Sequence, residues 1–255
     1  MIGAHWWNDA WWQPAIATGL IGIANHSWSR PAPATPEGEV VSWADRIAYV
    51  CHDWEDAVLA GIVAPGRGEV LYDGERFTRA RLDLRRRLNF IPDFPALFAH
   101  LTVIEQIALL LRVYEHDTPE SEERILHVLG ELDMLPLAES RVGGLSRGQI
   151  YKVALAALAT MSPALWLLDE PFASGLDPQG LAMLKQYVRA AAQAGSTTFY
   201  STQILDVAEK FCDLLVVVDH GQRRATYTRA ELAALPPQGP DSLEMKLRQF
   251  REPTA

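Results

Sequence analysis

The segment Leu145-Ser146-Arg147-Gly148-Gln149 combines residue types that can bind an anion. An Ala-rich run follows at residues 150–160 and predicts a helix. Ser146 is placed to cap that helix, whose first N–H groups and positive dipole end would face an anion such as phosphate. Gly148 allows an anion close to the backbone because it has no side chain. The segment predicts a phosphate contact, although a merely capped helix has the same pattern.

Two adjacent carboxylates follow a short apolar stretch that predicts a buried strand. Asp169 is suited to holding Mg²⁺, and Glu170 to polarising an attacking water. A turn then carries Asp177, which is expected to cap the next helix with Pro178 in its first position. A strand end and a turn are ordinary features when taken singly. The interpretation therefore rests on the three groups occurring in this order.

In this order and spacing the residues resemble the ATP-binding subunits of ATP-binding cassette (ABC) transporters. The resemblance makes residues 145–149 the signature motif and Leu165–Asp169 the Walker B strand. Glu170 takes the catalytic position, and Ser174–Asp177 forms the D-loop. It implies an α/β fold of the P-loop NTPase type, with a RecA-like core, an N-terminal antiparallel β part and an inserted α-helical subdomain. ATP and Mg²⁺ are the implied cofactors.

Composition fits a folded protein and argues against several classes. The 255 residues are 49% hydrophobic, enough for one globular domain with subdomains. A net charge of −9 argues against nucleic-acid binding, which needs clustered Lys and Arg. Two distant cysteines and scattered histidines predict neither a disulfide framework nor a metal cluster. The longest apolar run near the N-terminus, residues 15–24, is about half the length of a membrane span. We expect a cytoplasmic protein, held peripherally on the inner face of the cell membrane by a partner.

Three segments are expected along the chain. Residues 1–36 form a Trp-rich N-terminal segment and linker, residues 37–235 the ABC ATPase-like domain, and residues 236–255 a C-terminal extension. The helical subdomain is expected at about residues 95–145. The N-terminal tryptophans either pack on the chain's own core or dock on a partner or a membrane interface; they include Trp6, Trp7, Trp11 and Trp12.

Capping residues and periodicity predict the surrounding elements. A capping box at Thr102 opens a helix through Tyr114, and Thr118-Pro119 opens another that runs to about Asp133. These two helices should form the helical subdomain. A further helix runs from Pro178 and ends at Gly195, where glycine can adopt a left-handed conformation. Strands are predicted at residues 197–201 and 214–219, and a C-terminal helix at residues 242–250.

The family's phosphate loop is missing from the place where it should lie. The family pattern resumes at Leu59, so the loop would occupy the interval between Val41 and Ala57. This interval contains no glycine and no lysine. A phosphate loop needs glycines to turn consecutive N–H groups toward one anion and a lysine to bridge the outer phosphates. If residues 54–62 form a helix, acidic side chains at its N-terminus would repel a triphosphate; these are Asp53, Glu55 and Asp56.

Two further positions depart from the family pattern. Asp93 stands where the loop between core and helical subdomain usually carries a glutamine that senses Mg²⁺. An aspartate can still contact the metal, so Asp93 is a second metal candidate beside Asp169, unless it lies on an ordinary exposed turn. Gln203 stands where the family places a histidine that contacts the outermost phosphate. Glutamine can donate a hydrogen bond but has no proton that titrates near neutrality.

In the family, two such domains pair head to tail, and each ATP is held between one subunit's phosphate loop and the other's signature. This chain keeps the groups offered to a partner, namely residues 145–149 and Asp177, and lacks much of what its own site would use. We expect a heterodimer with a second ABC subunit that has an intact phosphate loop (Walker A), and a membrane permease above the two subunits. ATP and Mg²⁺ would bind at a composite site shared with that second subunit. Glu170 would then be vestigial. The alternatives are a non-enzymatic cassette-fold scaffold or regulatory interaction protein, and an autonomous ATPase with an unconventional phosphate site.

Overall fold

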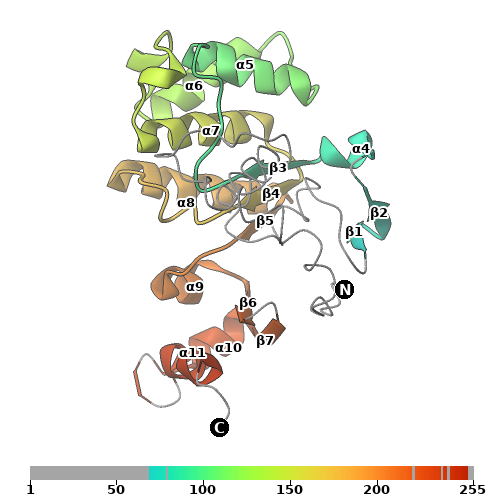
Figure 1. The fold of residues 1–255 in the computed structure, drawn as a ribbon, viewed down its shortest axis with the longest axis vertical. Coiled ribbons are helices and arrows are strands. Elements are labelled where there is room, and N and C mark those ends of the chain that lie inside the picture. The colour runs from blue at the N-terminus through green and yellow to red at the C-terminus, as the bar shows by residue number, and fades with distance from the viewer. Residues whose placement is uncertain (1–68, 79, 220–221, 237, 240–241, 252–255) are drawn as a thin grey trace, which may run out of the picture.

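The computed structural model describes residues 69–78, 80–219, 222–236, 238–239 and 242–251. The Trp-rich segment and the interval of the expected phosphate loop lie outside the described residues. The elements are stacked along the long axis of the molecule (Figure 1). The helical part, formed by the elements between residues 103 and 144, lies at one end. A parallel sheet lies in the middle, and an antiparallel strand pair lies toward the other end. This mixed architecture confirms the predicted α/β cassette fold.

A parallel sheet forms the centre of the described chain. It consists of β3 (Leu88–Ile91), β4 (Leu165–Leu168) and β5 (Thr197–Tyr200), in that order. Leu168 is the Cα partner of both Ile91 and Tyr200, so the three strands end level with one another. Because parallel strands present their carboxyl ends at one edge, the segments that follow them converge there. The strands predicted at residues 165–169 and 197–201 are confirmed, and each is one residue shorter in the structure.

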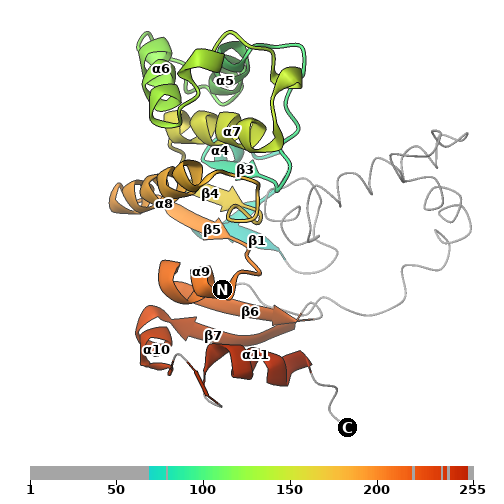
Figure 2. The same cartoon turned by 90° about the vertical axis from the view of Figure 1, so that its left-hand side faces the viewer.

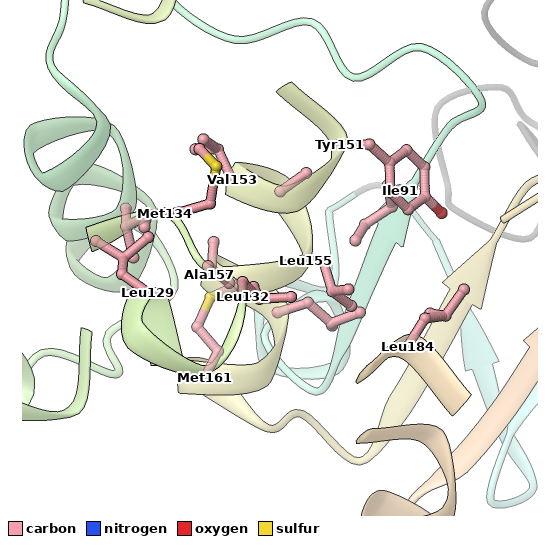
Figure 3. Close-up of a cluster of buried hydrophobic side chains, with 14 of the residues drawn as sticks. Ile91, Leu129, Leu132, Met134, Tyr151, Val153, Leu155, Ala157, Met161 and Leu184 are labelled. Atoms are coloured by element: carbon pink, nitrogen blue, oxygen red, sulfur yellow. The ribbon is translucent and has the colours of Figure 1, made fainter. Parts of the chain in front are cut away.

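The helix α7 (Arg147–Met161) lies between this sheet and the helical part (Figure 1). It is buried on nearly all sides, because β3, α8 (Pro178–Gln193), α5 (Val103–Val113) and α6 (Ser121–Glu131) all pack against it. Its Ala-rich sequence suits this position, since small side chains allow close approach from several directions. Figure 3 shows side chains of α7 within the main buried cluster, beside residues from α6, α8 and β3.

Most predicted helix boundaries agree with the structure. Thr102 caps α5 in a capping box with Glu105, and α8 ends just before Gly195, which has a φ of +92°. The predicted start of the next helix at Thr118 is wrong, because α6 begins at Ser121. The Ser121 hydroxyl accepts a hydrogen bond from the Thr118 N–H at 2.8 Å, which closes a turn ahead of the helix.

Smaller elements flank the sheet. The hairpin of β1 (Val70–Tyr72) and β2 (Glu75–Phe77) leads to α4 (Leu82–Arg85), and two 3₁₀ turns, η1 (Leu135–Leu137) and η2 (Val142–Gly144), precede α7. Figure 2 shows the remaining elements beyond the sheet. These are α9 (Leu205–Phe211), the antiparallel pair β6 (Leu214–Asp219) and β7 (Gln222–Thr228), then α10 (Arg229–Ala234) and α11 (Leu243–Arg251).

Candidate functional site at the carboxyl edge of the sheet

The carboxylate of Asp169, which is the expected Walker B residue, is held by a serine from the neighbouring strand. Asp169 follows β4 directly and is only 1% exposed. The Ser201 hydroxyl donates to Asp169 Oδ1 at 2.8 Å and accepts a hydrogen bond from the Glu170 N–H at 2.9 Å. One side chain therefore fixes both acidic residues, because the β4–β5 register brings Ser201 beside them.

Glu170 is held in an unusual backbone conformation. Its φ is +42°, in the left-handed region that costs a non-glycine residue about 1 kcal/mol or more. Its side chain is buried, and Oε2 accepts a hydrogen bond from the Gln203 N–H at 3.3 Å. The link from Gln203 to Glu170 thus runs through the backbone amide, which any residue except proline would supply. The exposed Gln203 side chain lines the cavity described below.

The signature segment begins α7 with a reciprocal capping box, as predicted for Ser146. The Ser146 hydroxyl accepts the Gln149 N–H at 3.3 Å, and Gln149 Oε1 accepts the Ser146 N–H at 2.8 Å. The N–H groups of Arg147 and Gly148 belong to the first turn of α7 and have no intrahelical acceptor. Ser146 and Arg147 are exposed. The helix end therefore presents a hydroxyl, two N–H groups and a positive dipole end to its surroundings.

Gly148 is packed closely against the D-loop of its own chain. A Cβ at Gly148 would lie 2.4 Å from the carbonyl oxygen of Gly175, closer than any side chain tolerates. Gly175 itself has a φ of +83°, which favours glycine. The structure thus adds an internal packing requirement to the phosphate contact predicted for Gly148.

Asp177 caps α8, as predicted, and also pairs with a buried lysine. Its Oδ1 accepts the Gly180 N–H at 2.6 Å, and its Oδ2 lies 2.8 Å from Lys152 Nζ. The Lys152 hydrogen bond, and then that from Gly180, hold the pKa of Asp177 below its ordinary value. Lys152 also donates to the Leu132 carbonyl at 3.0 Å. It therefore joins the end of α6, the signature helix and the D-loop.

Replacing Lys152 by methionine should destabilise the chain by about 2 kcal/mol, because a half-buried charge-assisted hydrogen bond to Asp177 is lost and the buried Leu132 carbonyl loses its charged donor. The Lys152 side chain is 7% exposed. Lys210 is the matched control, since it pairs with Asp206 while both side chains are 71% exposed. Lys210→Met should change stability by less than about 0.5 kcal/mol. Urea unfolding measures both variants, and equal losses would contradict this role for Lys152.

A cavity of about 260 Å³ opens beside the acidic pair. Asp93, Arg147, Glu170 and Gln203 line it, together with Ala173 and Ile204. Arg147 Nη2 lies 2.6 Å from Asp93 Oδ1. The two carboxylates and one guanidinium of this lining do not favour a triphosphate, which needs excess positive charge. Among the described residues, no group of three or more His, Cys, Asp or Glu is arranged to hold a metal ion.

Three residues of the site were not singled out from the sequence: Ser201, Lys152 and Tyr151. Ser201 ends a predicted strand, so its place beside Asp169 could have been inferred from strand adjacency. Lys152 looks like an ordinary exposed helical lysine, and nothing in the sequence signals its burial. Tyr151 is fully buried, and its hydroxyl has no hydrogen-bond partner among the residues that the structure describes. Burial, and then the charges of Asp169 and Asp93, raise the pKa of Tyr151 above its ordinary value.

Comparison with known proteins shows the family. The family model described as ABC transporter matches residues 57–173. The ABC-type transporter ATP-binding protein EcsA of Bacillus subtilis (strain 168) is 30% identical over 174 residues, which cover 68% of this chain and 70% of EcsA. The chain belongs to the ABC transporter ATP-binding proteins. As a member of this family, it is an ATP-binding subunit of a transporter, and the family binds ATP with Mg²⁺.

Solved structures agree with this assignment of the ABC subunit. One described as the ATP-binding subunit of an ABC transporter has a TM-score of 0.63 and 26% identity, covering 83% of this chain and 78% of its own. The structure of cbiO1 from Clostridium perfringens, described as part of the ABC transporter complex cbiONQ, has a TM-score of 0.56 and 25% identity, with coverage of 77% and 78%. No helix among the described residues has the length and apolar character to cross a membrane.

Proposed function

We propose that this ABC subunit completes the ATP site of a partner subunit and does not hydrolyse ATP at its own site. In this arrangement the partner has an intact Walker A and binds ATP and Mg²⁺ through it. The present chain contributes the end of its signature helix, residues 145–149, with Asp177 in the adjoining D-loop. Asp169 and Asp93 are the metal candidates of its own site, where Glu170 is vestigial and Gln203 replaces the family histidine.

The observation that carries the proposal is the absence of phosphate-loop chemistry from the sequence. No lysine occurs anywhere before Lys152, and no Gly-Lys pair occurs in the whole chain. The family match begins at residue 57, directly after the interval without glycine or lysine. A phosphate loop needs both residue types for chemical reasons, since its N–H groups and ammonium must neutralise a triphosphate. The acidic cavity lining beside Glu170 supports the same conclusion.

The signature end of α7 supports the other half of the proposal. It is exposed, capped and free of acidic residues in its first turn. Lys152 and the close Gly148–Gly175 contact hold it against the D-loop, so the two segments that would face the partner are packed together. A chain that had lost its function entirely would not need this arrangement.

The same reasoning extends to organisation and location. We propose a membrane permease as the second partner and a peripheral place on the cytoplasmic face of the cell membrane, because a transporter's ATP-binding subunit must reach its permease. The helical subdomain, about residues 95–145, is the part that would contact it. Residues 1–36 and 236–255 are proposed as additions to the ATPase-like domain at residues 37–235. Nucleic acid is not a proposed partner.

The isolated full-length chain should show no saturable binding of Mg-ATP. The physical reason is that binding at its own site would place a triphosphate among carboxylates without a lysine. Isothermal titration calorimetry with Mg-ATP up to millimolar concentrations measures this directly. Saturable binding in the micromolar range, lost in the Arg147→Glu variant, which removes the guanidinium of the cavity lining, would contradict an inert site and favour the autonomous ATPase.

A further inference from the structure

Two residues that are 54 positions apart in the sequence meet beside the cavity as an ion pair. Asp93 lies just after β3, where the chain leaves the sheet for the helical part. Arg147 is the first residue of α7, where the chain returns from the helical part. The pair therefore joins the outgoing and returning connections. It lies where the sheet adjoins the helical part, a place that we call the hinge.

The geometry of the pair is well defined. Arg147 Nη2 lies 2.6 Å from Asp93 Oδ1, with the two side chains 49% and 22% exposed. The stem of Arg147 runs past the D-loop, since its Cγ and Cδ lie 3.8 Å from the position of a Cβ at Gly175. Arg147 thus contacts the D-loop with its stem and the outgoing connection with its guanidinium.

Backbone hydrogen bonds already join the two connections nearer the helices. The Val142 N–H donates to the Leu101 carbonyl at 2.9 Å, and the Gly143 N–H to the Ala99 carbonyl at 3.0 Å. The Arg147–Asp93 pair adds a side-chain link closer to the sheet. It is therefore placed to control how the start of α7 sits relative to the cavity.

We infer that Arg147 and Asp93 are positioning residues that form a latch, which holds the signature helix to the chain's own hinge loop. The inference rests on the proposed function, because a donated signature must be in place when the partner binds ATP. Asp93 stands where the resemblance expects a metal-sensing glutamine. In this chain the guanidinium of Arg147 supplies the positive charge that Asp93 faces. The position of the signature helix would therefore depend on Arg147 and not on a metal bound at the chain's own site.

Hydrogen exchange of the full-length chain tests the latch without any partner. In Asp93→Asn and in Arg147→Gln, the hydrogen-bonded amides of Phe98, Gln149 and Ile150 should exchange about two- to five-fold faster, the range expected for a partly exposed ion pair. The charge-swapped variant, with Asp93→Arg and Arg147→Asp together, should recover most of the protection. Unchanged exchange in the single variants, or no recovery in the swap, would overturn the latch.

A matched control comes from the same helical part. Arg112 Nε lies 3.2 Å from Asp117 Oδ2 in an exposed pair away from the hinge. Arg112→Gln should leave exchange in both hinge segments as in the wild type. Faster exchange there would mean that any lost ion pair loosens the subdomain, and would overturn a specific role for Arg147.

Kinetics in the assembled transporter separate the latch from the proposed function. If the latch populates the donating position, its loss in Asp93→Asn, which leaves residues 145–149 unchanged, should raise the KM for ATP about two- to five-fold with a smaller change in kcat, because only the competent fraction binds. An unchanged KM alongside faster exchange would overturn the positioning role. Whether the signature is donated at all is decided separately by a Ser146 variant, so the two ideas can fail independently.

Discussion

Replacing Ser146 by aspartate should reduce the ATPase activity of the assembled transporter about 100-fold, the effect of losing one positioned donor at a developing charge. Aspartate is as good a helix cap as serine and also favours the positive dipole end, so α7 should keep its start. Its carboxylate would however face the partner's bound phosphate and repel it. Steady-state ATP hydrolysis by the purified complex measures the loss.

Two variants of the same chain serve as controls for this result. Thr228→Asp changes another capping-box residue, at the start of α10, and should leave hydrolysis unchanged. Glu170→Gln keeps the size and hydrogen-bonding shape of the vestigial carboxylate, and should also leave hydrolysis near the wild-type rate. A large loss with Glu170→Gln and none with Ser146→Asp would mean that the roles of the two sites are reversed.

Replacing Gly148 by alanine should destabilise the chain by about 1–3 kcal/mol, the usual cost of forcing extra volume into a packed contact. The added Cβ would meet the backbone carbonyl oxygen of Gly175 at 2.4 Å, and a backbone atom cannot move aside as a flexible side chain can. The signature helix and the D-loop would have to separate. Urea unfolding of the full-length chain measures the change.

The opposite result is expected at a glycine with free space around it. Gly130 lies in α6, and a Cβ there would meet nothing within 4 Å. Gly130→Ala should therefore stabilise the chain by about 0.5–1 kcal/mol through better helix propensity. Equal effects at the two positions would show that the Gly148–Gly175 contact has no energetic importance. Ser146 is consequently the better probe of signature chemistry, because a Gly148 variant also disturbs the packing.

The sequence predicted the elements whose ends carry strong local chemistry. Ser146, Thr102 and Asp177 all cap the helices that they were expected to cap. Gly195 ends its helix in the left-handed conformation, as glycine allows. The carboxylates of Asp169 and Asp93 follow neighbouring parallel strands, so their convergence at one edge followed from the fold class.

Long-range pairing of side chains could not be predicted. Lys152 reaches Asp177 across the packing of α7 on α8, and no local rule shows that a lysine in an Ala-rich helix faces inward. The Arg147–Asp93 pair depends on how two distant connections approach one another. The start of α6 was misplaced because Thr118-Pro119 resembles a helix start, whereas Ser121 turns the chain first.

The most direct test of the central claim is purification of this chain from native membranes under gentle conditions, with partners identified by mass and ATP hydrolysis assayed in the same preparation. The account predicts a permease and a second ABC subunit that contains a complete phosphate loop, together with ATPase activity. Recovery of the chain alone, or with other proteins but no ATPase activity, would contradict signature donation and leave the cassette-fold scaffold as the better explanation.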